Sequence, residues 1–143
     1  MTRVKDPYEN DRGPAVQQHN GKTILLAEDD PFISRMYETK LANAGYHVVL
    51  VRNGRDAYDH IKSDNPDLIM LDISMPELSG FEVIKALQAN GLDDLVQRIV
   101  VVTNSADPGN RAKARELGID YMIKAELTPQ DVLVRINEKL GVA

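Results

Sequence analysis

The chain has 143 residues, of which 43% are hydrophobic and 27% are charged, a composition typical of a single globular domain. It contains no cysteine, which excludes disulfides and thiolate metal sites, and no apolar run approaches the roughly 20 residues that span a bilayer. The net charge of -5 and the 5% of aromatic residues disfavour nucleic acid, whose binding normally uses a basic face and stacking rings. We therefore expect a cytoplasmic protein with neither a membrane nor a nucleic-acid partner.

The first 22 residues differ in pattern from the rest of the chain. They are polar, contain two prolines and show no hydrophobic periodicity or apolar run. We predict that residues 1–22 form a flexible tail and that residues 23–143 form one domain.

From Thr23 onward, short apolar runs alternate with amphipathic segments. The runs are rich in Val, Ile and Leu without polar alternation, which indicates strands buried on both faces, as in a parallel sheet. In chain order, the predicted strands and helices cover residues 24–27, 31–44, 46–51, 54–63, 68–71, 80–90, 99–102, 108–117, 121–123 and 128–140. This alternation predicts a doubly wound (βα)5 fold with five parallel strands.

Local signals fix the first predicted helix. Asp30 and Pro31 are typical of an N-cap followed by the first helical residue, and Gly45 stands where a left-handed C-cap is expected. The helix carries an apolar stripe at helical spacing, formed by Ile33, Met36, Tyr37, Leu41 and Ala44. We expect this stripe to face the core.

Polar side chains follow four of the predicted strands. Glu28 and Asp29 follow the first strand, Asp72 the third, Thr103 the fourth and Lys124 the fifth. Each alone is more often a cap, a β-former or a solvated residue. Because the carboxyl ends of parallel strands meet at one edge, where such sheets bind ligands, we expect these groups to converge.

Three converging carboxylates need a counter-charge, because like charges raise a pKa or destabilise the fold. Oxygen ligands without His or Cys suit a hard cation such as Mg2+, with Mn2+ as a substitute. His19, His47 and His60 show no ligand spacing, and the run 93–94 is interpreted as a solvated turn. Carboxylates that bind a divalent cation, together with a lysine and a hydroxyl, are the groups that phosphoryl transfer uses for positioning and charge neutralisation.

Four stretches carry a family resemblance: LLAEDDP, LIMLDISMPELSGFE, IVVVTNS and GIDYMIK. In this order and spacing they resemble the receiver domain of bacterial two-component response regulators, in a stand-alone, chemotaxis-regulator-like form. The resemblance covers residues 23–140 and implies a flavodoxin-like sheet in the order 2-1-3-4-5. It also implies a phosphoacceptor signalling module, not a turnover enzyme, that assists only its own phosphorylation and dephosphorylation.

The resemblance assigns roles to the acidic residues. Asp72 matches the phosphoryl acceptor, whose donor is the phosphohistidine of a histidine kinase or of a histidine phosphotransfer protein. Glu28 and Asp29 match the acidic pair that holds Mg2+. Asp72 shares the metal, and the backbone carbonyl of Ser74 completes the protein ligands.

The resemblance also implies a switch. Lys124 matches the lysine that pairs with the acceptor or its phosphate, Thr103 the hydroxyl that turns toward the phosphate, and Tyr121 the aromatic residue that swings inward. The downstream protein partner is then expected on the face formed by the helix over 108–117, the strand over 121–123 and the helix over 128–140.

Two positions depart from the commonest family pattern. The residue after Thr103 is usually small and is here Asn104, which affects access to the phosphate or adds a hydrogen bond. The residue after Lys124 is usually a proline joined by a cis bond and is here Ala125. Because a cis bond before a non-proline residue costs roughly 2.5–4 kcal/mol, we expect a trans or otherwise reshaped loop.

Ser74 and Ser105 stand two residues past the acceptor and the switch threonine. In the family, these positions influence how fast water attacks the acyl phosphate. Both side chains are short and should shield little, so we expect ready autodephosphorylation.

Two other functions compete with this interpretation. One is a metal-dependent phosphatase or phosphotransferase of the haloacid dehalogenase type. Such enzymes have a second Asp two residues after the nucleophile, and the Ser74 of this chain at that position argues against this function. A degenerate receiver that binds partners without phosphorylation would not need the intact site. Whether the chain acts alone or is part of a longer protein stays open.

Overall fold

The computed structural model describes residues 19–142. Most of the tail predicted over residues 1–22 lies outside the described residues, and its boundary stays a prediction. Within the described part, Asn20 N–H donates to the carbonyl of Gly45 at 3.1 Å, so the chain contacts the domain just before the first strand.

Five parallel strands form one sheet in the order β2-β1-β3-β4-β5. Their bounds are β1 Thr23–Ala27, β2 His47–Val51, β3 Leu68–Leu71, β4 Ile99–Thr103 and β5 Asp120–Ile123. Each end lies within one residue of the prediction, and the doubly wound topology is confirmed.

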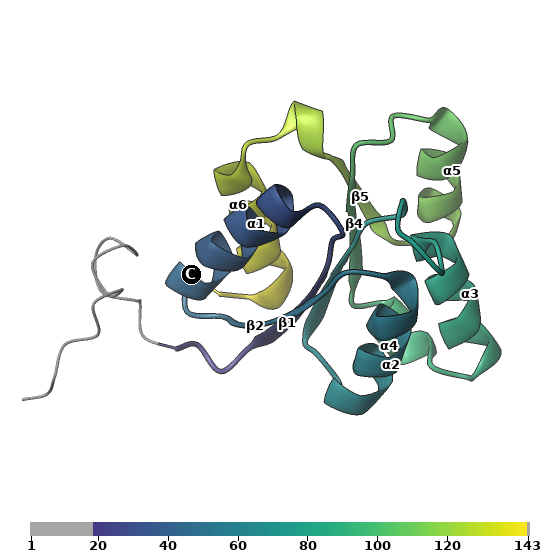
Figure 1. Cartoon of the computed structure of the whole chain (residues 1–143), viewed down its shortest axis with the longest axis horizontal. Helices are drawn as coiled ribbons and strands as arrows, with labels where there is room; N and C mark the ends of the chain where they lie inside the picture. Colours follow the sequence, from purple (N-terminus) through teal and green to yellow (C-terminus); the bar gives the residue numbers. More distant parts are fainter. Residues whose placement is uncertain (1–18, 143) are drawn as a thin grey trace, which may run out of the picture.

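Six α-helices and one 3-10 turn connect and flank the strands of the described chain. They are α1 Pro31–Asn43, α2 Gly54–Asp64, α3 Gly80–Ala89, α4 Asp93–Val96, α5 Pro108–Glu116 and α6 Pro129–Leu140, with the 3-10 turn over Lys124–Glu126. Figure 1 shows α1 and α6 on one side of the sheet and α2, α3 and α5 on the other. None of the described helices is both long and apolar enough to cross a membrane.

The sheet separates two hydrophobic cores, which explains the unbroken apolar runs in the sequence. Successive side chains of a strand point to opposite faces, so Leu25 joins the core under α2, α3 and α5. Leu26 joins the core under α1 and α6, where Ile136 is fully buried. Both faces of β1 are therefore covered.

Three local predictions meet the structure differently. The run 93–94 is exposed as expected, but it begins the single-turn helix α4, whose Leu95 and Val96 are buried. Met36 was expected in the core and is 42% exposed, so that prediction is wrong, although Tyr37 beside it is buried. The chain after Lys124 forms a 3-10 turn and no cis peptide occurs among the described residues, as expected from Ala125.

Candidate functional site

The polar residues after the strands meet at the carboxyl edge of the sheet. The N–H of Glu28 donates to the carbonyl of Val51 at 3.1 Å, and the N–H of Asp72 donates to the carbonyl of Ala27 at 3.1 Å. These bonds continue the parallel ladder one residue past β1 and β3. Because the two strands are neighbours in register, Glu28 and Asp72 leave the sheet side by side.

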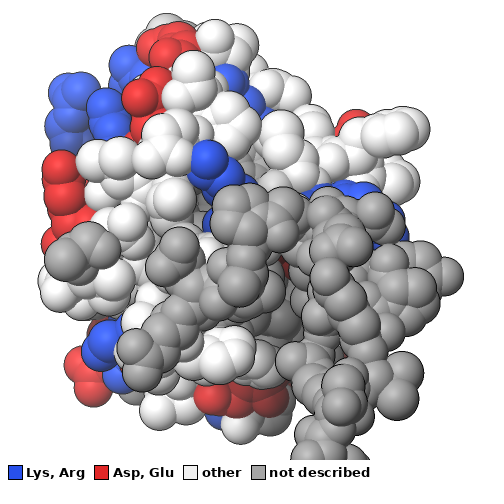
Figure 2. All heavy atoms as spheres, turned by 90° about the vertical axis from the view of Figure 1, so that its left-hand side faces the viewer, with Lys and Arg blue, Asp and Glu red and all other residues white. Residues whose placement is uncertain are grey.

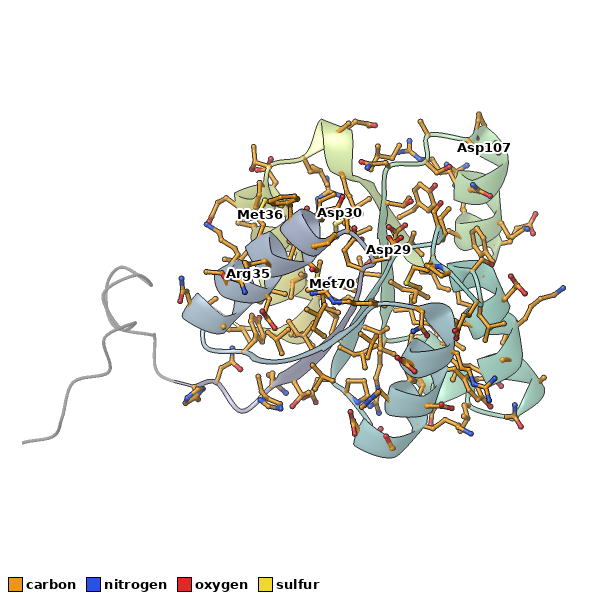
Figure 3. All side chains as sticks on the ribbon, in the orientation of Figure 1. Asp29, Asp30, Arg35, Met36, Met70 and Asp107 are labelled. Carbon is orange, nitrogen blue, oxygen red and sulfur yellow. The ribbon has the colours of Figure 1, made fainter. Side chains whose placement is uncertain are left out.

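Three carboxylates gather at this edge, as predicted. One oxygen from each of Glu28, Asp29 and Asp72 lies within 4.8 Å of the other two. Glu28 and Asp72 are buried, at 3% and 6% exposure, whereas Asp29 is exposed. Figure 3 places Asp29 where β1 gives way to α1. The all-oxygen donor set with one solvent-facing member fits a hard, partly hydrated cation such as Mg2+.

Lys124 is the cation of the cluster. Its Nζ lies 2.7 Å from Glu28 Oε2 and 3.1 Å from Asp72 Oδ2, and its side chain is 9% exposed. Burial alone would lower the pKa of Lys124, but its contacts with Glu28 and Asp72 outweigh burial and raise it. When all three carboxylates are ionised, the one ammonium of Lys124 leaves two negative charges unbalanced, which a divalent cation would neutralise.

Glu28 has a raised pKa in this site. Burial raises the pKa of Glu28 to about 7, and the charge of Asp72 adds to the rise while Lys124 opposes it. A cation bound beside Glu28 would stabilise the ionised form of this carboxylate, which burial disfavours.

Asp30 stands apart from its two acidic neighbours. Its Oδ1 accepts from the N–H groups of Phe32 and Ile33 at 2.9 and 3.0 Å, and Pro31 is the first residue of α1. The predicted N-cap is confirmed, and Figure 3 places Asp30 at the start of this helix. The acidic triplet therefore divides into two carboxylates of the cluster and one helix cap.

The loop after β3 is fastened to the buried aspartate. The N–H of Ser74 donates to Asp72 Oδ1 at 3.1 Å, and Ser74 itself is exposed. This close packing depends on glycine: a Cβ on Gly80 would lie 2.7 Å from the Asp72 carbonyl oxygen, and one on Gly54 would lie 1.9 Å from the Leu78 carbonyl oxygen. Sequence reasoning missed both glycines, because such contacts depend on the tertiary fold.

Thr103 and Tyr121 meet at Ser105. Thr103 is buried, and its hydroxyl accepts from the N–H of Ser105 at 3.3 Å. The half-buried Tyr121 donates its hydroxyl to the carbonyl of Ser105 at 2.7 Å. The two candidate switch residues are thus joined through Ser105 in the β4–α5 loop. Asn104, which lies between Thr103 and Ser105 in the sequence, is exposed.

Two features at the site went unrecognised in the sequence. Tyr37 lines a small cavity together with Glu28, Asp72 and Lys124. Phe32 is 87% exposed on the first turn of α1, two residues after the Asp30 cap. Only the three-dimensional position of α1 brings Tyr37 under the cluster and turns Phe32 outward.

The charge on the surface is mixed. On the face that Figure 2 shows, acidic and basic side chains lie next to one another over the described residues.

Comparisons with known proteins agree on one family. A family model described as the response regulator receiver domain matches residues 24–137. The response regulator MprA of Mycolicibacterium vanbaalenii is 34% identical over 117 residues, which is 82% of this chain and 49% of MprA. The polar-differentiation response regulator DivK of Brucella anthropi is 31% identical over 124 residues, which is 85% of this chain and 98% of DivK.

A solved structure supports the same assignment. The CheY-like response regulator receiver domain protein of Methanospirillum hungatei JF-1 has a TM-score of 0.72 and 28% identity, over 84% of this chain and 94% of that one. The chain spans about half the length of several curated relatives it matches, MprA among them, and nearly all of DivK.

Proposed function

The chain belongs to the response regulator receiver domain family, and on that premise we propose that it is a phosphoacceptor signalling module in which Asp72 takes the phosphoryl group. The observation that carries the proposal is the buried contact of Lys124 with both Asp72 and Glu28 at the carboxyl edge of the sheet. The donor is the phosphohistidine of a histidine kinase or of a phosphotransfer protein in the cytoplasm.

The carboxylates suited to hold a divalent cation are those of Glu28, Asp29 and Asp72. The family resemblance adds the backbone carbonyl of Ser74 as the remaining protein ligand. When bound, Mg2+ neutralises charge on the transferring phosphoryl group. Lys124 contributes a second positive charge within the same site, at 3.1 Å from the acceptor oxygen Asp72 Oδ2.

The transfer is a single displacement at phosphorus. A carboxylate oxygen of Asp72 attacks, an O–P bond forms as the P–N bond of the phosphohistidine breaks, and the imidazole leaves with the bonding electron pair. The Ser74 N–H and the Lys124 ammonium orient the attacking carboxylate, because each binds one of its oxygens. Catalysis of this kind consists of positioning and charge stabilisation.

Phosphorylation then changes the balance around Thr103. The acyl phosphate carries about -1.5 to -2 charges in place of the -1 of the free carboxylate, and it brings new acceptor oxygens to which the Thr103 hydroxyl and Lys124 can donate. If Thr103 turns toward them it releases the Ser105 N–H, and Ser105 is also the partner of Tyr121. The proposed output surface is the face of α5, β5 and α6, where a downstream protein binds.

The phosphoryl donor protein has an apolar surface to dock on. Phe32 and Met36 lie one helical turn apart on α1 and are 87% and 42% exposed. Phe32 follows the Asp30 cap by two residues. Exposed aromatic and methionine side chains beside a reaction centre are typical anchors for a partner protein.

A direct test uses a small phosphoryl donor. Incubation with Mg2+ and acetyl phosphate should add one hydroxylamine-labile phosphoryl group to the wild type, and EDTA should prevent it. Asp72→Asn should abolish the mass gain, whereas the matched control Asp107→Asn, at the exposed cap of α5, should not. An unchanged gain in Asp72→Asn refutes the acceptor assignment, and rapid turnover of general phosphate esters would favour a phosphatase.

A further inference from the structure

Arg111 on α5 reaches two neighbouring segments of the chain. Its guanidinium carbon lies 5.7 Å from the centre of the Tyr121 ring on β5, within the range of a cation–π contact. Its Nη2 lies 3.9 Å from Oε2 of Glu126, in the 3-10 turn that begins at Lys124. One side chain therefore connects α5 with the aromatic candidate of the switch and with the turn that carries the lysine of the site.

Helix α5 has few other anchors. Of its nine residues, Ala114 alone is buried. Near the start of the helix, the side chain of Asn110 donates to the hydroxyl of Ser105 at 3.0 Å. A segment with so little buried apolar surface opens at a low free-energy cost, so single polar contacts affect its position. The contacts of Asn110 and Arg111 therefore help to determine where α5 lies.

The segment that pairs with Arg111 is one where this chain departs from its family. The commonest family pattern has a proline after the lysine, whereas Ala125 stands here and the chain forms a 3-10 turn over Lys124–Glu126. Glu126 is the last residue of that turn and faces Arg111. The contact thus belongs to this chain, and the common family pattern does not imply it.

Tyr121 is held both at its hydroxyl and at its ring. The hydroxyl donates to the carbonyl of Ser105 at 2.7 Å, and the ring lies against Arg111. The proposed switch requires Thr103 to release the N–H of Ser105 and Tyr121 to move inward, away from Arg111. A contact that is made in only one of two arrangements shifts the equilibrium toward that arrangement. Arg111 therefore opposes the switch.

We propose that Arg111 is a positioning residue that holds Tyr121 and α5 in the unphosphorylated arrangement and so limits how readily the protein switches. This inference rests on the proposed phosphoacceptor function and adds to it the contact that restrains it. The restraint is small, because the side chains of Arg111 and Glu126 are 45% and 58% exposed, and such contacts are weak at exposed sites. Phosphorylation can therefore overcome it.

The test uses beryllofluoride, which together with Mg2+ imitates a phosphoryl group on an aspartate. Arg111→Met keeps the length of the side chain and removes its charge. In this variant the affinity of the full chain for beryllofluoride should rise about three-fold, because a larger fraction already has the binding arrangement. Mg2+ affinity without beryllofluoride should stay within about two-fold of wild type in calorimetry, because the carboxylate cluster is unaltered. The matched control is Arg115→Met, at an exposed position one turn further along α5, and it should leave both affinities unchanged.

A double-mutant cycle shows whether Arg111 acts through Tyr121. In a Tyr121→Leu background, Arg111→Met should leave the beryllofluoride affinity unchanged, because the ring that Arg111 holds is gone. A second readout needs neither metal nor phosphate. With ring-labelled tyrosine, the NMR signal of Tyr121 in metal-free Arg111→Met should lie part of the way toward its position in the wild-type beryllofluoride complex.

The outcomes separate this inference from the function on which it rests. A beryllofluoride affinity that is unchanged or weaker in Arg111→Met overturns the inference, as does a Tyr121 signal that does not move. An equal gain in Arg115→Met, or in the Tyr121→Leu background, overturns it as well. If the wild type neither binds beryllofluoride with Mg2+ nor takes a phosphoryl group at Asp72, the proposed function itself has failed.

Discussion

Asp30 gives the sharpest test of how the acidic triplet divides. Replacing Asp30 by Ala removes both hydrogen bonds to the first turn of α1, which span 2.9 and 3.0 Å. Loss of such a cap costs about 1 kcal/mol, within a range of roughly 0.5–2 kcal/mol. For about 120 ordered residues, with an unfolding entropy near 2.1 cal/mol/K per residue, that corresponds to a fall of about 4 °C in Tm.

The assay is thermal and urea unfolding followed by far-UV circular dichroism in EDTA, so that metal binding does not contribute. Asp30→Asn is the matched control, because Asn caps helices about as well as Asp and should restore most of the loss. Mg2+ binding should persist in both variants and be lost in Asp29→Asn, which should not unfold more easily in EDTA since it relieves repulsion within the carboxylate cluster. The reasoning is refuted if Asp30→Ala leaves stability unchanged, or weakens Mg2+ binding as much as Asp29→Asn does.

Three further predictions follow from the site. The folded-state pKa of Glu28 is raised to about 7 from 4.5, so ionisation of this group opposes folding above pH 7, and the penalty fades as pH falls toward 4.5. Glu28→Gln should therefore stabilise the metal-free protein at pH 8, by up to roughly 3 kcal/mol in urea unfolding. A loss of stability in this variant would contradict the reasoning. Phe32→Ser should slow phosphoryl transfer from a phosphohistidine protein about ten-fold but leave transfer from acetyl phosphate unchanged. The control Val134→Ser, at a position 44% exposed on α6, should slow neither reaction. Equal slowing of both reactions by Phe32→Ser would rule out a docking role. With the short side chains of Ser74 and Ser105 beside the site, the phosphorylated protein should decay readily, and a half-life of many hours in a phosphate-release assay would disprove it.

The sheet and the cluster could be read from the sequence because each rests on a local signal. Unbroken apolar runs occur where a strand is covered on both faces, as Leu25 and Leu26 in opposite cores illustrate. The carboxyl ends of parallel strands meet by topology alone, so Glu28 and Asp72 were expected together before any distance was known. Asp30 was separable because the residue after it is Pro31.

The remaining features depend on the angle and depth at which helices pack. Met36 and Tyr37 belong to the same predicted stripe, and a periodicity of 3.6 does not distinguish two adjacent positions, of which one is exposed and the other buried. Helix α4 is a single turn, too short to give a periodic pattern. The meeting of Thr103 and Tyr121 at Ser105 depends on the course of an irregular loop, which no sequence pattern specifies.

The central claim is that Asp72 accepts the phosphoryl group, and chemical trapping of the acyl phosphate tests it most directly. Borohydride reduction after incubation with Mg2+ and acetyl phosphate converts a phosphorylated aspartate to homoserine, which peptide mass spectrometry locates. The account predicts homoserine at position 72 alone, dependent on Mg2+ and on Lys124. Homoserine at position 29, or none at position 72 while the intact protein gains a phosphoryl mass, would contradict it.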